Sequence, residues 1–135
     1  MIQRRFDVAD NKNRNTYTIY DDDTIGTVQI ADEVVAIIAG LAATEVEGVD
    51  SMVGNITNEL VAKLGMKNLA KGVKIEVNEN VVHVRIVLNI KYGYNIPETS
   101  KAVQDRVKTA IENMTGLEVS GVDVGIADVV LDPAK

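Results

Sequence analysis

Apolar and polar residues alternate most regularly between residues 73 and 92. Two alternating segments, residues 73–77 and 81–92, are separated by the polar run Asn78-Glu79-Asn80. Side chains that alternate in this way point to opposite faces of a strand, one toward a core and one toward water. The pattern therefore predicts an antiparallel hairpin. The core-facing residues expected in its second strand are Val82, Val84, Ile86, Leu88, Ile90 and Tyr92, and the water-facing residues are Val81, His83, Arg85, Val87, Asn89 and Lys91.

In two other segments the apolar residues recur every three or four positions, which is typical of an amphipathic helix. In the first, residues 32–46, Asp32 is expected to be the N-cap and Gly48 to stop the helix. In the second, Pro97 is expected in the first turn and Gly116 directly after the last. The expected core-facing stripes are Val34, Ile38, Leu41, Ala42 and Glu45 in the first helix, and Val103, Val107, Ala110, Ile111 and Met114 in the second.

A stripe of small residues, Ala36, Gly40 and Ala43, follows another side of the first helix. Glycine inside a helix is about 1 kcal/mol less favourable than alanine. We therefore expect another part of the backbone to pack closely against Gly40. The alternative is that this stripe leaves room for a small ligand, such as an acyl group, between the helices and the sheet.

Shorter segments complete the predicted fold. Strands are expected at residues 16–20, 26–30, 49–53 and 119–131, with a bulge or strand end at 128–130, where the alternation slips. Residues 54–71 are expected to hold one or two helical turns within a mobile connection. The predicted class is α+β, in two layers: a mainly antiparallel sheet with two amphipathic helices on one face, in the order β-α-β-β-β-α-β. Residues 16–135 would form one domain behind a flexible, weakly basic tail, residues 1–15.

The composition removes several kinds of chemistry. One histidine and no cysteine exclude a Cys/His zinc site, a disulfide framework and a thiol nucleophile. The net charge of −6 disfavours binding to nucleic acid, and four tyrosines and one phenylalanine leave few rings that could stack on bases. We therefore expect no cofactor, no metal and no nucleic-acid partner.

No segment suits a membrane span or a secretory signal. The longest apolar run, residues 34–43, is much shorter than the roughly 20 residues that a spanning helix needs. The basic pair near the N-terminus is not followed by an apolar region. The protein is therefore expected in the cytoplasm.

His83 is the only imidazole available for catalysis. A hydrolytic triad would need it beside one of three serines, Ser51, Ser100 or Ser120, and none of these has the local sequence of a nucleophile elbow. The favoured interpretation is a surface histidine that pairs with Lys74 or Glu76 across the hairpin.

Two other features are ambiguous. The acidic run Asp21-Asp22-Asp23 before Gly26 departs from a calcium-binding loop at two ligand positions and is interpreted as a turn. Residues 92–97 would connect the strand to the helix and cover the junction between them. Gly93 would permit the sharp turn out of the strand, and the side chains of Tyr92 and Ile96 would fill the space at the junction. The alternative for this segment is a ligand or partner site.

Five stretches, residues 26–49, 71–75, 92–97, 103–107 and 113–119, resemble the alkaline shock protein family of Gram-positive bacteria. They occur in the order and spacing of that family between residues 26 and 131. The motif positions are mostly glycine, proline and core apolar residues, so the resemblance transfers no catalytic or ligand residue. The positions that carry it as structural motifs are Gly26, Gly48, Gly72, Tyr92, Gly93, Pro97 and Gly116.

The resemblance implies a non-enzymatic scaffold or regulator of envelope stress homeostasis. The family's properties imply self-association and a small membrane-anchor protein that would hold the chain at the inner face of the membrane. The closest branch suggests a link to fatty-acid synthesis and control of acetyl-CoA carboxylase. The expected contact surface is the polar sheet face with His83, Arg85, Val87, Asn89 and Lys91. The alternatives are a lipid- or acyl-binding module and, third, a hydrolase that uses carboxylates near the strand ends.

Overall fold

The computed structural model describes residues 16–22, 24–53 and 66–131. The predicted tail, residues 1–15, and most of the connection at 54–71 lie outside the described residues. The elements in chain order are β1 (Thr16–Asp22), β2 (Gly26–Ala31), α1 (Asp32–Thr44), β3 (Val49–Met52), the 3-10 helix η2 (Met66–Gly72), β4 (Val73–Asn78), β5 (Val81–Lys91), α3 (Ile96–Thr115) and β6 (Glu118–Val130).

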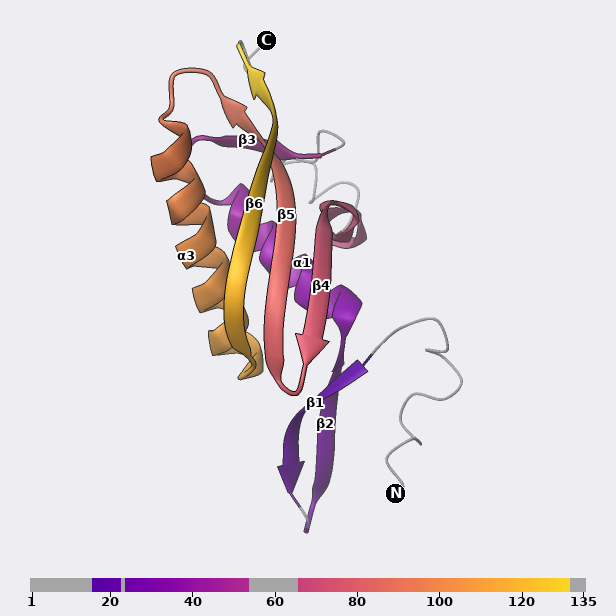
Figure 1. Cartoon of the computed structure of the whole chain (residues 1–135). Helices are drawn as coiled ribbons and strands as arrows, with labels where there is room; N and C mark the ends of the chain where they lie inside the picture. The colour runs from indigo at the N-terminus through magenta and orange to yellow at the C-terminus, as the bar shows by residue number, and fades with distance from the viewer. Residues whose placement is uncertain (1–15, 23, 54–65, 132–135) are drawn as a thin grey trace.

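The main sheet is built around β5. The last strand, β6, pairs with β5 along its whole length, while β4 and β3 pair with successive parts of its other side. In the view of Figure 1, α1 lies behind this sheet and α3 runs along its flank beside β6. The expected two-layer α+β fold, with both helices on one face, is confirmed.

The predicted hairpin is present, and Glu79 and Asn80 both adopt positive φ at its turn. That pair of conformations matches the right-handed twist of the two strands. Three of the four described strand pairs are antiparallel, and the exception is the parallel pair of β5 and β6. The parallel pairing follows from α3, which carries the chain back along the sheet between the two strands. The slip expected at residues 128–130 lies slightly earlier, between Ile126 and Asp128.

A separate two-stranded sheet, β1 and β2, extends beyond the main body at the end where α1 begins (Figure 1). Its strands are antiparallel, and Thr16 pairs with Ala31, the residue before α1. At the other end of the hairpin, Gly26 has a φ of 125°, which favours glycine. Asp21 and Asp22 of the acidic run, expected in a turn, are the last two residues of β1, and Asp23 lies outside the described residues.

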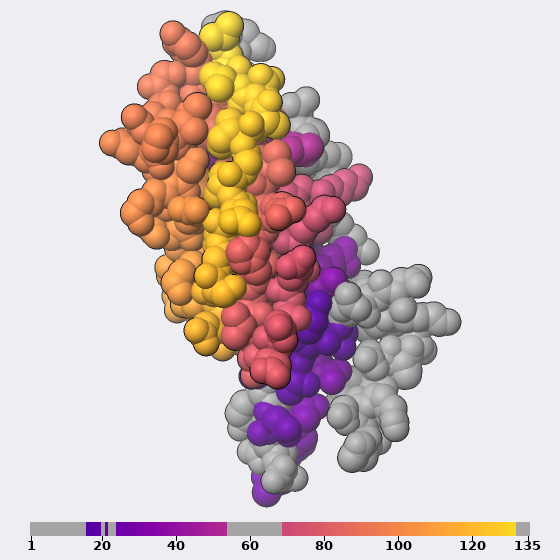
Figure 2. Space-filling view, viewed as in Figure 1, coloured from indigo at the N-terminus to yellow at the C-terminus, as the bar shows by residue number. Residues whose placement is uncertain are grey.

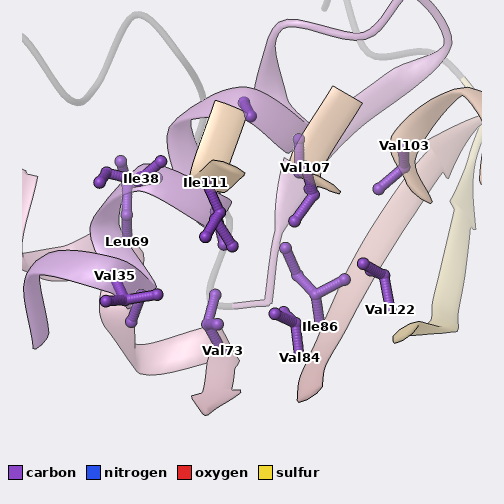
Figure 3. Close-up of a cluster of buried hydrophobic side chains, with 14 of the residues drawn as sticks. Val35, Ile38, Leu69, Val73, Val84, Ile86, Val103, Val107, Ile111 and Val122 are labelled. Atoms are coloured by element: carbon purple, nitrogen blue, oxygen red, sulfur yellow. The ribbon is translucent and has the colours of Figure 1, made fainter. Parts of the chain in front are cut away.

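The core lies between the helices and the sheet (Figure 3). It combines β-branched and other aliphatic side chains from α1, α3, η2 and the sheet, including Val35, Ile86, Val107 and Ile111, all with no exposed surface. The expected close approach at Gly40 is confirmed, because a Cβ there would lie 2.9 Å from Cβ of Leu69. The neighbour that makes this contact is η2.

The structure corrects the predicted details of α1. Asp32 is the first helical residue, while Ala31 is the N-cap and supplies no side-chain hydrogen bond. The helix ends at Thr44, before Gly48. Its buried side is centred on Val35 and the small-residue stripe, so Val34 is 41% exposed instead of facing the core.

The prediction for α3 is confirmed at its ends and partly wrong along its side. Asn95 is the N-cap, its Oδ1 accepting the Glu98 N–H at 2.9 Å, and Pro97 lies in the first turn. Gly116, with a φ of 80°, ends the helix in the left-handed conformation. Met114, expected in the core, is 69% exposed.

The segment between β5 and α3 does not cover the junction of strand and helix with Tyr92 and Ile96 as expected. Strand β5 ends at Lys91, and Tyr92 and Ile96 are 67% and 40% exposed. The backbone N–H of Tyr92 still donates to the carbonyl of Val130 at 2.8 Å. In Figure 1 this end of the sheet runs past the first turn of α3, so neither α1 nor α3 covers it.

Candidate interaction face on the open side of the sheet

The main sheet has one face that neither helix covers, here called the open face. It carries Lys74 and Glu76 of β4, His83, Arg85 and Val87 of β5, and Asp123 of β6. Figure 2 shows this face: side chains of β4, β5 and β6 form the surface, and neither α1 nor α3 lies over them. Arg85 is exposed, and His83, Val87 and Lys91 are partly buried. Four of the five predicted contact residues therefore reach solvent on β5.

The fifth, Asn89, is wrongly predicted as a contact residue, because it is only 7% exposed. Its Nδ2 donates to Oγ of Ser51 at 3.0 Å and, more weakly, to the carbonyl of Met52 at 3.5 Å. Both partners belong to β3, which pairs with this end of β5. A buried amide needs such partners, so Asn89 has a structural role in joining the two strands.

His83 makes the shortest polar contact on the open face. Its Nε2 lies 2.8 Å from Oδ2 of Asp123, and the two side chains are 39% and 56% exposed. A Cβ at Gly121 would lie 3.0 Å from Cε1 of His83, so the imidazole lies close over that glycine. The expected pairing with Lys74 or Glu76 is therefore wrong, because the partner comes from the parallel neighbour β6 and not from the hairpin.

The hydrogen bond from His83 is the main reason why the pKa of the Asp123 carboxyl lies below its ordinary value. Desolvation opposes it, and smaller Coulombic contributions from His83 and Arg85 lower the pKa further. A lowered carboxyl pKa means that the ionised form is favoured in the folded protein. This contact therefore stabilises the folded state at pH values above the ordinary carboxyl pKa of 3.8. The stabilisation is lost as the pH falls through the lowered pKa of Asp123 in the folded protein.

Replacing His83 with alanine should raise the pKa of Asp123 toward its ordinary value, since the hydrogen bond that lowers it most is removed. The measurement is the carboxyl ¹³C chemical shift of Asp123 against pH. Glu112 is the internal control, because its pKa is lowered by the Val119 N–H and Lys108, which the substitution leaves in place. An unchanged Asp123 titration would contradict the contact.

The structure does not bring a serine hydroxyl to His83 as a triad requires. Ser120 and His83 line the same surface hollow, of about 670 Å³, beside the hairpin turn. The Oγ of Ser120, however, donates to the carbonyl of Val82 at 3.2 Å, and that of Ser51 donates to Asp50. Within residues 16–22, 24–53 and 66–131, no hydrogen bond joins a serine to His83. The same described residues contain no group of three or more His, Asp or Glu side chains that could hold a metal ion.

Tyr94, rather than Tyr92, packs the segment between β5 and α3 onto the body. Its ring lies against Gly48, where a Cβ would be 2.8 Å from Cδ2 of the tyrosine. Its hydroxyl also donates to Oε2 of Glu47 at 3.4 Å. Gly48 and Gly93 both have positive φ, so backbone conformation favours glycine at both positions, and lack of space favours it at Gly48 as well.

The remaining glycines among the structural motif positions fall at close contacts or turns. A Cβ at Gly72 would lie 2.9 Å from Cε of Met52. The room expected beside Gly40 for an acyl group is taken by Leu69. An apolar hollow does exist, but it lies between the outer surfaces of α1 and α3.

The match with known families covers residues 20–131, for a family described as "Asp23 family, cell envelope-related function" (here a family name, not residue 23). The chain belongs to this family. The resemblance to alkaline shock proteins is thereby confirmed, together with a function related to the cell envelope. No helix within the described ranges has the length and apolar character needed to cross a membrane.

Several relatives align with most of the length of this chain. Protein YqhY of Bacillus subtilis (strain 168) is 33% identical over 113 residues, which are 84% of this chain and 84% of the relative. Protein YloU of the same organism is 29% identical over 77% of this chain and 88% of the relative. A "Stress response regulator gls24 homolog" of Streptococcus pyogenes serotype M6 is 28% identical over 77% of this chain and 59% of its own length. Among solved structures, MamM CTD aligns with a TM-score of 0.46 and 10% identity over 72% of this chain and 95% of the other.

Proposed function

We propose that this protein is a non-enzymatic, cytoplasmic scaffold or regulator of envelope stress homeostasis. The observation that carries the proposal is the open face, which presents both signs of charge around Val87 on a rigid sheet. The family's envelope-related function and the regulator name of one relative support the biological setting. An enzymatic role is less favoured, because Ser120, the serine that lines the same hollow as His83, donates to the backbone carbonyl of Val82 and not to the imidazole.

The chemistry of the open face suits contacts that form and dissociate. Lys74 and Arg85 are opposite one another on β4 and β5, and Asp123 lies opposite Arg85 on β6. Such a surface with both signs of charge gives an interface orientation and partner choice, while a partly buried valine supplies apolar contact. A second copy of this chain offers the same two cations and one carboxylate for complementary contacts.

Three partners are compatible with this proposal. The first is another copy of the chain, which would make the protein a self-associating scaffold. The second is a small membrane-anchor protein that would hold the chain at the inner face of the membrane. The third is an enzyme of fatty-acid synthesis, with control of acetyl-CoA carboxylase as the regulatory outcome.

Arg85→Glu and Val87→Glu should each weaken association by about tenfold or more, because each places a carboxylate in the contact. Sedimentation velocity over a range of protein concentrations measures self-association, and affinity purification from the native host tests the other partners. Lys101→Glu on α3 is the matched control for Arg85→Glu, since it makes the same charge change at a position that is 74% exposed and away from the sheet. Circular dichroism checks that all variants fold.

The proposal fails if the unmodified protein stays monomeric at every concentration and the purification recovers no partner. It also fails if Lys101→Glu weakens association as strongly as Arg85→Glu, since the effect would then reflect net charge alone.

A further inference from the structure

A second unoccupied surface lies on the opposite side of the molecule, along the seam between α1 and α3. Val34 and Met114, both expected in the core, are 41% and 69% exposed there. With Ile37, Leu41 and Ala110 they line an apolar hollow of about 400 Å³. The α1 residues in it recur at intervals of three and four, so one whole stripe of this helix has no partner from the described chain.

The hollow continues along the two helices. At one end Val34 of α1 lies across from Met114 of α3, and farther along Val46 and Ala102 line a second hollow of about 460 Å³. The helices are therefore antiparallel. Glu45 of the first hollow and Arg106 of the second form an ion pair at 3.2 Å, so the two hollows are neighbours on either side of this contact. We call the combined surface the helix groove.

Negative charge predominates in the helix groove. Its linings contain the carboxylates of Glu45, Glu47 and Asp105. Arg106 pairs with Glu45 and Lys101 pairs with Asp105 at 3.6 Å, while Glu47 belongs to neither ion pair. The last turn of α1 contains no basic residue, so the negative end of its dipole adds to the effect. The groove therefore favours an occupant that is apolar along its centre and positively charged at its edges.

A second copy of α1 fits this description poorly. The helix has Asp32 and Glu33 in its first turn, and Glu45 and Glu47 follow its last residues. An antiparallel pair of α1 helices would place these carboxylates opposite one another, and like charges at such distances repel. The net charge of −6 opposes the same association at longer range.

We infer that the helix groove binds a basic amphipathic helix of a partner protein. Its apolar residues, spaced by three and four, would pack on Val34, Leu41 and Met114, and its lysines or arginines would face the carboxylates. This inference goes beyond the function proposed above, because it uses the opposite side of the molecule. One copy could therefore hold a helical partner while its open face makes a different contact.

The test uses a fluorescently labelled peptide of about 14 residues, made of leucine and lysine in a helical amphipathic order. Fluorescence anisotropy should show saturable binding to the full chain that weakens with added salt. A peptide of the same composition in scrambled order should bind at least about tenfold more weakly, because its leucines no longer form one stripe. A peptide with glutamate in place of lysine should also bind more weakly, by a similar factor.

Two variants locate the site without disturbing the core. Val34→Lys and Met114→Lys each remove an exposed apolar contact and add a charge of the peptide's own sign, so each should weaken binding about tenfold. Val129→Lys is the matched control, because Val129 is 38% exposed on β6 and should leave binding within about twofold. Arg85→Glu on the open face should also leave it unchanged, which separates this test from that of the proposed function.

Equal loss of binding in Val129→Lys, or equal binding of the scrambled peptide, would overturn the inference, because the interaction would then be general charge attraction. Loss of self-association in Val34→Lys and Met114→Lys, without loss of peptide binding, would overturn it in favour of a second copy as the occupant.

Discussion

Replacing Gly40 with alanine is expected to lower the free energy of unfolding by about 1–3 kcal/mol, even though alanine is the better helix former. Helix propensity alone would raise stability by about 1 kcal/mol. The new Cβ, however, would lie 2.9 Å from Cβ of Leu69 and 3.2 Å from its carbonyl oxygen. Neither atom is at the end of a flexible side chain, so relief requires η2 to move away from α1. Chemical denaturation followed by circular dichroism measures the difference.

Gly125→Ala is the control for this substitution. At that position the nearest side-chain atom to an added Cβ is Cγ2 of Val87 at 3.7 Å, which is an ordinary van der Waals distance. Its stability should change by no more than about 0.5 kcal/mol. A Gly40→Ala protein as stable as the unmodified chain would show that η2 does not pack where the structure places it.

The second large effect is expected at Asn89. Replacing it with alanine should lower the free energy of unfolding by about 1–3 kcal/mol, because a buried hydrogen-bonding side chain is lost between β3 and β5. Association should stay the same once the folded fraction is taken into account, since this side chain is 7% exposed. Thermal or chemical denaturation measures stability, and sedimentation velocity measures association.

Ser51→Ala tests the same contact from β3. It removes the hydroxyl that accepts from Nδ2 of Asn89 at 3.0 Å and leaves that buried donor without its better partner. The two substitutions together should be less destabilising than the sum of their separate effects. If Asn89→Ala instead weakened association while stability stayed constant, Asn89 would belong to the contact surface, as the alternation alone suggested.

The contrast between Asn89 and Arg85 shows where periodicity stops being informative. Both residues lie on the same side of β5 by the alternation of the sequence. At Arg85 the neighbours are Lys74 and Asp123, and the side chain is exposed. At Asn89 the neighbouring strand is β3, which shields the amide and supplies its acceptors. A period of two gives the direction of a side chain, but which strand lies beside it depends on pairing between distant segments.

At the candidate interaction face, too, the sequence predicts the direction of the side chains but not their contact partners. The alternation correctly placed His83, Arg85 and Val87 on one side of one strand. The partner of His83 could not be found in this way, because Asp123 lies 40 residues away on a strand that pairs in parallel. The space that lets the imidazole reach it comes from Gly121, a residue that gave no signal in the sequence.

The sequence by itself determined the α+β class, the hairpin of β4 and β5, the small-residue stripe of α1 and the glycine that ends α3. These features depend on local backbone preferences and on short-range periodicity, which act between neighbours in the chain. Only the tertiary structure decided that Val34 and Met114 stay outside the core, that η2 fills the space at Gly40, and that Asp123 meets His83. The area between the two layers is limited, so not every apolar side chain can be buried there. Which side chains are buried depends on how segments that are distant in the sequence pack together.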